Sequence, residues 1–152
     1  MKVKNFDLDY LRENFEYKKD SSKNYWNVLD KNNLKGDCED FALTALMIET
    51  GSWPKFIKEL VVGKAKIVHC EAPSGVAHAI LKMGDKYIDN WEMRWVDKNF
   101  LIDAGYKLTK TQYLWPITMI KLILGGSVIV KLVAAGAFVG SVYLIAAISE
   151  SI

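Results

Sequence analysis

The chain has 152 residues, of which 51% are hydrophobic, and this length suits a single domain built around one core. Its 20 lysines and arginines nearly balance its 18 aspartates and glutamates, so the sequence offers no basic surface for a nucleic-acid partner. Two cysteines without a CxxC pair, together with two histidines, leave too few ligands for a structural zinc site.

Hydrophobic residues recur at helical spacing near the N-terminus, where Phe6, Leu8, Leu11 and Phe15 stand among charged residues. This spacing predicts an amphipathic helix over about the first 15 residues, with its apolar side packed on the core. The polar run SSKN breaks the pattern, and we expect residues 25–33 to form a loop or a short helix.

A second helix is predicted to begin at Cys38. Asp37 is a favourable N-cap, Asp40 lies where a capping box has its acid, and Gly51 is a stop signal. The apolar stripe between these ends consists of Phe41, Ala42, Ala45, Leu46 and Ile48. The first turn of a helix has unpaired N–H groups and the positive end of the helix dipole, which lower the pKa of a thiol. Cys38 is therefore a candidate nucleophile.

Three runs rich in β-branched and aromatic residues follow, and they predict strands over 59–70, 76–83 and 86–91. Gly84 and Asp85 join the last two runs, and a two-residue connection with glycine first is typical of a tight antiparallel hairpin. The predicted chain order is thus a cysteine-bearing helix followed by an antiparallel sheet.

The hairpin register brings a histidine and an aspartate together. If Met83 pairs with Lys86, His78 becomes the diagonal neighbour of Asp89 on one face of the sheet. A histidine beside Cys38 can take the thiol proton, and a carboxylate on its other ring nitrogen orients the ring. Singly, the three residues have ordinary interpretations as a core thiol, a satisfied strand histidine and a turn aspartate. In this combination they indicate a Cys–His–Asp triad.

The segments GDCEDFAL, HAIL, YIDNW and GYKLTKTQ together resemble the bacterial transglutaminase-like cysteine peptidases, a branch of the papain-like superfamily. The resemblance extends over roughly residues 20–110. It implies that Cys38 is the nucleophile, His78 the general base and Asp89 the acid that orients it, and that the Tyr106 region forms the terminal strand. The implied fold is α+β, a papain/transglutaminase-like core in which the Cys-bearing helix packs on an antiparallel sheet.

Further candidates surround the triad. The backbone N–H of the nucleophile is the first candidate for stabilising an oxyanion, with Asn32 and Asn33 as side-chain candidates or, alternatively, loop-capping residues. Trp91 is a candidate wall of the substrate cleft. His69 and Cys70 are strand neighbours that point to opposite faces, so they cannot act as a dyad. No metal and no organic cofactor is expected.

The composition changes near Trp115, because nearly all charged residues lie before it. We therefore divide the chain into a transglutaminase-like cysteine peptidase domain, 1–114, and a hydrophobic tail, 115–152, that forms a helix or a helical hairpin. The uncharged run Leu132–Ile148 reaches the lower limit of a membrane-spanning helix. A buried hairpin inside a larger assembly is the alternative.

The tail also suggests partners and a location. Gly136 and Gly140 form a GxxxG pattern, which favours a homo-oligomer or a larger assembly. Lys107 and Lys110 precede the apolar run, so the positive-inside rule predicts a membrane-associated chain with its catalytic domain in the cytoplasm.

Three functions follow from these patterns. The first is a cysteine-dependent amide-bond hydrolase that acts on a peptide or protein through an acyl-thioester, with transfer to an amine sharing the same intermediate. The second is a peptidoglycan amidase or endopeptidase with the same triad. The third is a structural or membrane-insertion protein, a virion component of phage type, whose peptidase domain is a relic.

Overall fold

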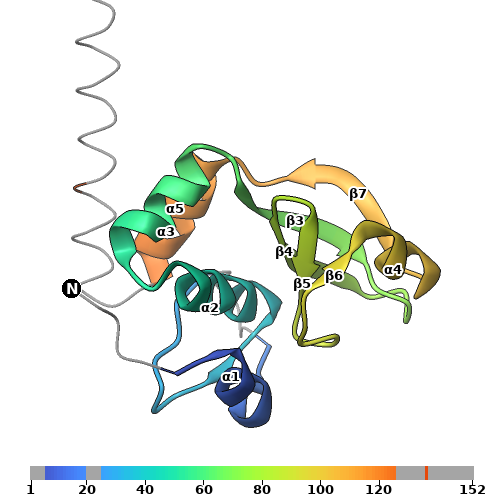
Figure 1. Cartoon of the computed structure of the whole chain (residues 1–152), viewed down its shortest axis with the longest axis horizontal. Helices are drawn as coiled ribbons and strands as arrows, with labels where there is room; N and C mark the ends of the chain where they lie inside the picture. Colours follow the sequence, from blue (N-terminus) through green and yellow to red (C-terminus); the bar gives the residue numbers. More distant parts are fainter. Residues whose placement is uncertain (1–5, 20–24, 126–135, 137–152) are drawn as a thin grey trace, which may run out of the picture.

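The computed structural model describes residues 6–19, 25–125 and 136, and in this part of the chain helices surround a curled antiparallel sheet (Figure 1). The helices are α1 (Leu8–Asn14), α2 (Cys38–Thr50), α3 (Trp53–Val61), α4 (Lys98–Asp103) and α5 (Trp115–Gly125). The strands are β1 (Glu16–Tyr17), β2 (Lys35–Gly36), β3 (Ala65–Glu71), β4 (Ala77–Met83), β5 (Lys86–Ile88), β6 (Val96–Asp97) and β7 (Lys107–Gln112). The predicted α+β class is confirmed.

The main sheet has the strand order β6-β5-β4-β3-β7, and all its pairs are antiparallel. Its central hairpin joins β4 to β5 with Met83 opposite Lys86, which confirms the predicted register. Gly84 opens the turn with φ 59°, a left-handed backbone that glycine adopts without steric cost. A separate pair, β1 and β2, is parallel and lies just before α2.

Helix α2 begins at Cys38 and packs on β4, as the sequence predicts. The Asp37 side chain accepts hydrogen bonds from the backbone N–H groups of Glu39 and Asp40, and Gly51 ends the helix with φ 66°. The helix is central to the main core, in which it buries Phe41, Ala42, Leu43, Ala45, Leu46 and Met47. The cysteine-bearing end of α2 is therefore fixed by a side-chain cap and by core packing.

Two predicted strands were too long. Residues 59–61 form the end of α3 and Val62 is its C-cap, because Pro54 in the first turn favours a helix that buries Phe56 and Leu60, four residues apart. The β-branched residues Val61 and Val62 suggested a strand, but β3 begins only at Ala65. At the other end of the hairpin β5 stops at Ile88, because the carboxylate of Asp89 accepts hydrogen bonds from two backbone N–H groups and turns the chain.

Helix α5 lies beside α3 (Figure 1) and buries Thr118, Met119 and Leu122. The start of the predicted tail thus packs against the core that α2 organises. Among the residues that the structure describes, no helix has the length and apolarity needed to cross a membrane. Apart from Gly136, the predicted run Leu132–Ile148 lies outside those residues.

Candidate active site

His78 and Asp89 make a buried contact between neighbouring strands. His78 Nε2 lies 2.8 Å from Asp89 Oδ2, and the two side chains are 4% and 1% exposed. His78 is the second residue of β4 and Asp89 directly follows β5, so the hairpin register carries the contact. This is the diagonal pair that the predicted register requires.

Hydrogen bonds hold both carboxylate oxygens of Asp89. Oδ2 accepts from His78 and, at 2.8 Å, from the Tyr106 hydroxyl. Oδ1 accepts from the backbone N–H groups of Trp91 at 3.2 Å and of Glu92 at 2.8 Å. Burial opposes ionisation of Asp89, but the hydrogen bonds from His78, Glu92 and Tyr106 outweigh it and lower the pKa. The carboxylate is therefore ionised near neutral pH.

The orientation of the His78 ring follows from its two neighbours. An ionised carboxylate only accepts hydrogen bonds, so Nε2 of His78 carries a proton and Nδ1 is the nitrogen that can take one up. The ring also stacks on Trp91, with centroids 4.9 Å apart and planes inclined by 26°. Trp91 is 47% exposed, so the stack borders solvent.

Cys38 lies against the start of β4. The backbone N–H of Ala79 hydrogen-bonds to its sulfur, so the peptide group that joins His78 to Ala79 faces the thiol. The thiol itself donates to Glu39 Oε2, with Sγ and Oε2 2.9 Å apart. Within residues 6–19 and 25–125 no hydrogen bond joins the thiol directly to the imidazole. The structure thus brings Cys38 next to the strand that carries the histidine, with its proton directed at Glu39.

The surroundings of Cys38 keep its thiol protonated. Burial raises the pKa of Cys38, the charge of Glu39 and its hydrogen bond raise it further, and the Ala79 N–H acts in the opposite direction. The helix dipole alone predicts a lowered pKa. The structure shows the reverse because burial, followed by the charges of Glu39 and Asp37 at the start of α2, favours the neutral thiol.

Glu39 also approaches a second histidine. Glu39 is 7% exposed, and its Oε1 lies 3.9 Å from Nε2 of His69 on β3. The His69 ring packs edge-on against Tyr113 with centroids 4.8 Å apart. The next residue, Cys70, lies in the core on the other side of the sheet, as strand alternation predicts. Burial, followed by the charge of Asp89, raises the pKa of Cys70 to about 12.

A groove of about 450 Å³ opens beside the histidine, and we call it the His78 groove. Its lining residues are Phe15, Tyr17, Val76, Ala77, His78, Asn90, Trp91 and Met93. None of these lining residues is an aspartate, glutamate, lysine or arginine, and three of them, Phe15, Tyr17 and Trp91, are aromatic. The groove is thus an apolar surface that ends on the ring of His78.

Asn32 and Asn33 do not line this groove. They are exposed in a turn, where the Asn32 N–H donates to Asp30 Oδ1 at 2.8 Å and the Asn33 N–H to the Asp30 carbonyl at 3.1 Å. This is the backbone geometry of a loop in which Asp30, rather than either asparagine, supplies the side-chain acceptor.

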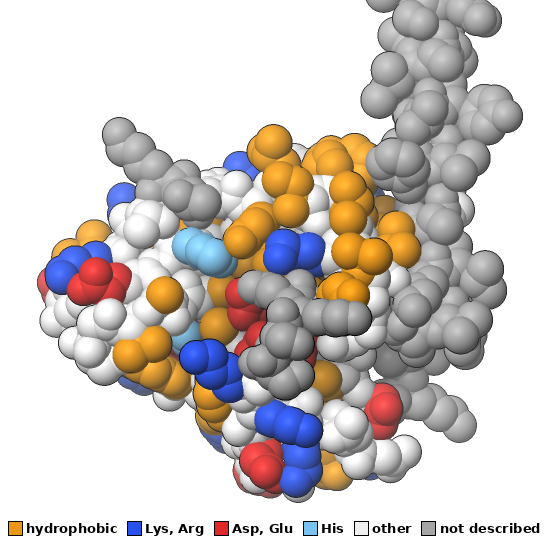
Figure 2. All heavy atoms as spheres, turned by 180° about the vertical axis from the view of Figure 1, so that it is seen from behind, with side chains coloured by type: hydrophobic (Ala, Val, Ile, Leu, Met, Phe, Trp, Pro, Cys, Tyr) orange, Lys and Arg blue, Asp and Glu red, His pale blue; other side chains and the backbone are white. Residues whose placement is uncertain are grey.

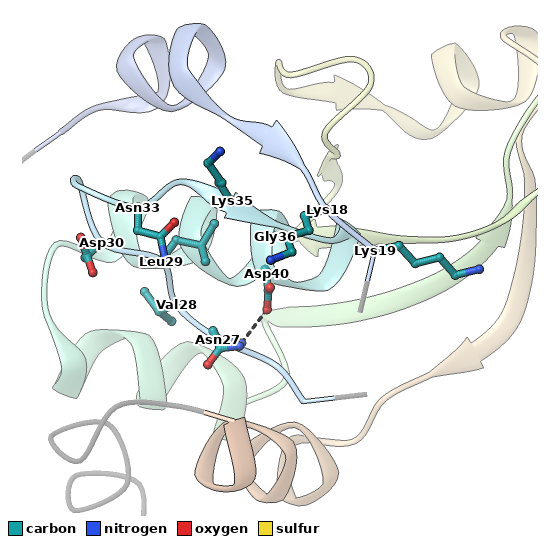
Figure 3. Close-up of a pocket in the computed structure, with 10 residues that line it drawn as sticks. All are labelled: Lys18, Lys19, Asn27, Val28, Leu29, Asp30, Asn33, Lys35, Gly36 and Asp40. Atoms are coloured by element: carbon teal, nitrogen blue, oxygen red, sulfur yellow. Dashed lines mark hydrogen bonds between the residues drawn. The ribbon is translucent and has the colours of Figure 1, made fainter. Parts of the chain in front are cut away.

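Asn33 lines a second cavity, of about 490 Å³, together with residues 27–30 and the strand β2 (Figure 3). The close-up shows Lys18, Lys19 and Lys35 around it, with Asp40 accepting a hydrogen bond from the Asn27 N–H at 2.7 Å. The two cavities therefore differ in character, since this one is polar and the His78 groove is apolar.

Sequence reasoning missed two residues that touch the candidate triad. Glu39 follows the cysteine in the first turn of a helix, where an acid is favourable for the helix dipole alone. Tyr106 lies 17 residues beyond Asp89, and its hydroxyl meets that carboxylate only because the chain after α4 returns along β3 as β7. No local pattern in the sequence marks either contact.

The described residues include no cluster of three or more His, Cys, Asp or Glu side chains that could hold a metal ion. Both cysteines are free thiols; Cys38 is half-buried and Cys70 is 4% exposed. The candidate site thus consists of a half-buried thiol, a buried His–Asp pair and an apolar groove.

Comparisons with known proteins add little to this description. No family model matches the chain, and no curated protein matches it significantly. Among solved structures, the chain is similar to Legionella pneumophila LapG (EGTA-treated), with 20% sequence identity and a TM-score of 0.47. The match covers 68% of this chain and 64% of that one, so the chain spans less than two thirds of its length.

Proposed function

We propose that the chain is a cysteine-dependent amide-bond hydrolase of the transglutaminase-like peptidase type, with Cys38 as nucleophile, His78 as general base and Asp89 as the orienting acid. One observation carries the proposal. The histidine of a buried His–Asp pair lies at the start of β4, and the backbone of this strand contacts a cysteine at the N-terminus of a helix. The three residues can supply the nucleophile, the base and the orienting acid that thiol-based acyl transfer needs, and helix α2 and the β4–β5 hairpin hold them.

In the proposed reaction Nδ1 of His78 takes the proton of the Cys38 thiol, and the sulfur attacks the carbonyl carbon of the scissile amide. The backbone N–H of Cys38 stabilises the negative oxygen of the tetrahedral intermediate. His78 then gives its proton to the leaving amine, the C–N bond breaks, and an acyl-thioester remains on Cys38. Water, activated by the same histidine, hydrolyses the thioester to a carboxylic acid and restores the thiol.

In the resting state, before this reaction, the Cys38 thiol donates a hydrogen bond to Glu39. For the proton to move to His78, the S–H bond of Cys38 has to turn away from Glu39 Oε2. Glu39 thus competes with His78 for the thiol, and the resting enzyme of this proposal has a neutral cysteine rather than a thiolate–imidazolium pair.

Hydrolysis of a peptide library tests the proposal. The wild-type chain and Cys38→Ala are incubated with the library, and new termini are identified by mass spectrometry. Cleavage by the wild type alone supports the proposal. If both proteins leave the library and purified peptidoglycan intact, and no acyl-enzyme forms on Cys38, the proposed activity is wrong. Cleavage of peptidoglycan alone would assign the cell-wall alternative.

We further propose that residues 115–152 attach the chain to a membrane, with the catalytic domain on the cytoplasmic side. The described start of this segment supports the proposal, because hydrophobic residues at helical spacing are exposed there: Ile117 (43% exposed), Ile120 (49%) and Leu124 (53%), with Leu114 (67%) just before it. Figure 2 shows a column of hydrophobic side chains on one side of the molecule. An exposed stripe of this kind marks an interaction surface.

Cell fractionation tests the membrane proposal. The full chain is compared with a chain that ends at Gly125, which keeps the core residues Met119 and Leu122 of α5. We expect the full chain in the membrane fraction and the shorter chain in the soluble fraction. A full chain that stays soluble and self-associates without detergent would instead support an assembly.

A further inference from the structure

Asn90 places an unused hydrogen-bonding group in the wall of the His78 groove. The residue lines the groove and is 5% exposed, and its Oδ1 has no hydrogen-bond partner in the part of the chain that the structure describes. Buried amide oxygens in folded proteins are nearly always paired, because leaving one unpaired costs its full desolvation. The oxygen is itself buried, so an N–H group of a bound ligand would supply the missing donor once the Asn90 amide turns toward the groove.

The groove also exposes large hydrophobic side chains from three separate segments. Tyr17 on β1 is 54% exposed, Val76 just before β4 is 58% exposed, and Trp91 after β5 is 47% exposed. Large apolar side chains gathered around one hollow mark a binding surface rather than scattered surface residues. The groove volume of about 450 Å³ lies within the range of ligand pockets, roughly 300–1,000 Å³.

The loop that carries Asn90 and Trp91 is held in an uncommon shape. Met93, which also lines the groove, has φ 50°, a left-handed backbone that non-glycine residues adopt only rarely. Its N–H bonds to the carbonyl of Asp89 at 2.9 Å, which turns the loop back toward the histidine. The same turn thus positions one amide and two hydrophobic side chains along the groove.

We infer that the His78 groove binds a bulky apolar side chain of a peptide substrate, close to the scissile amide, and that Asn90 Oδ1 accepts a hydrogen bond from the main-chain N–H of the same peptide. The inference rests on the proposed function. A charged substrate side chain would lose its hydration against walls that offer no opposite charge. An extended peptide satisfies both features at once, with its side chain on the aromatic walls and its main chain on the amide.

Two kinds of thiol reagent separate this inference from the proposed function. Iodoacetamide reports whether Cys38 reacts at all, since it is too small to fill the groove. Matched acetyl-dipeptidyl acyloxymethyl ketones report the groove, with phenylalanine or aspartate at each of the two positions before the reactive group. We expect the phenylalanine reagent to label Cys38 at least about tenfold faster than its aspartate counterpart at one position.

Two exposed valines provide a matched pair of variants. Val76→Lys puts a cation on the rim of the groove, whereas Val62→Lys makes the same change at the C-terminal end of α3, outside it. We expect Val76→Lys to reduce the phenylalanine preference by about fivefold or more and Val62→Lys to leave it unchanged. Both side chains are exposed, at 58% and 62%, so either substitution should keep the fold.

Asn90→Ala tests the main-chain contact. It should slow labelling by the phenylalanine and aspartate reagents by the same factor, about five- to tenfold, and leave the iodoacetamide rate within about twofold. Normal iodoacetamide labelling of Cys38 combined with equal phenylalanine and aspartate rates would overturn the inference and leave the proposed function standing. Failure of every reagent to label Cys38 in preference to Cys70 would overturn both.

Discussion

Glu39 Oε2 accepts the hydrogen bond of the Cys38 thiol at 2.9 Å, and Glu39 Oε1 lies 3.9 Å from Nε2 of His69. The neighbour of the candidate nucleophile in the chain is therefore also its hydrogen-bond partner. An acceptor that is negatively charged and 7% exposed stabilises the neutral thiol over the thiolate. Reactivity at Cys38 should accordingly depend on the charge of Glu39.

Glu39→Gln should lower the pKa of Cys38, because it removes a charge that raises this pKa while keeping a side-chain acceptor. The rate of iodoacetamide labelling at Cys38 follows the thiolate fraction, so its rise with pH should shift to lower pH in the variant. Glu49→Gln, near the other end of α2, is the matched control. An unchanged pH profile in Glu39→Gln would mean that burial alone sets the reactivity.

The two cysteines should differ in reactivity in the native protein. Cys38 is half-buried at a helix terminus, whereas Cys70 is 4% exposed within a core cluster. The pKa of both thiols is raised, so access of the reagent decides between them. Brief native alkylation should therefore modify Cys38 alone, and alkylation in denaturant should modify both. Peptide mass spectrometry measures the two sites separately. Equal native rates at the two thiols would contradict the burial pattern.

Asp89 should make the fold sensitive to acid. Its pKa is lowered in the folded chain relative to the ordinary value of 3.8, so its ionised form stabilises the fold above about pH 4. This stabilisation is lost as the pH falls through 3.8 toward the lower folded value. Asp89→Asn should flatten the dependence of the unfolding free energy on pH in this range, measured by urea denaturation. Asp85→Asn, in the exposed hairpin turn, is the control and should keep the wild-type slope.

Tyr106 is expected to position Asp89 rather than to touch the substrate. Tyr106→Phe removes the hydroxyl that donates to Asp89 Oδ2 at 2.8 Å, so the pKa of Asp89 should rise and the His78 ring should be held less firmly. We expect the labelling rate of Cys38 by a peptide reagent to fall about three- to tenfold and its pH profile to shift. Tyr87→Phe, in the same core cluster, should leave the profile unchanged. If the pH profile of Tyr106→Phe is as unchanged from wild type as that of Tyr87→Phe, Tyr106 does not position Asp89.

The parts of the site that short-range patterns determine could be predicted from the sequence. Capping chemistry located the start of α2 at Cys38, and the glycine-first turn fixed the register that joins His78 to Asp89. The end of α3 could not be predicted, because β-branched residues there obscured a helix whose identity depends on packing of Phe56 and Leu60. The Tyr106 contact depends on how β7 returns along β3, which no local pattern encodes.

The raised pKa of Cys38 could not be predicted from the sequence either. The helix dipole is a local property and can be inferred from the capping pattern, but its effect on Cys38 is outweighed by burial and by the orientation of the Glu39 side chain. Burial and side-chain orientation follow from tertiary packing. The contact between His78 and Asp89 was therefore accessible from the sequence, and the electrostatic state of the Cys38 thiol was not.

The most direct test of the proposed triad compares His78 with His69, the histidine that approaches Glu39. Labelling of Cys38 by an acyloxymethyl ketone peptide is measured at neutral pH in wild type, His78→Ala and His69→Ala, with circular dichroism to verify that each variant is folded. The account predicts that labelling is abolished in His78→Ala and persists in His69→Ala, because His78 is the histidine bonded to Asp89 at 2.8 Å. Labelling that persists in His78→Ala and disappears in His69→Ala would contradict the proposed triad and assign the base to the histidine beside Glu39.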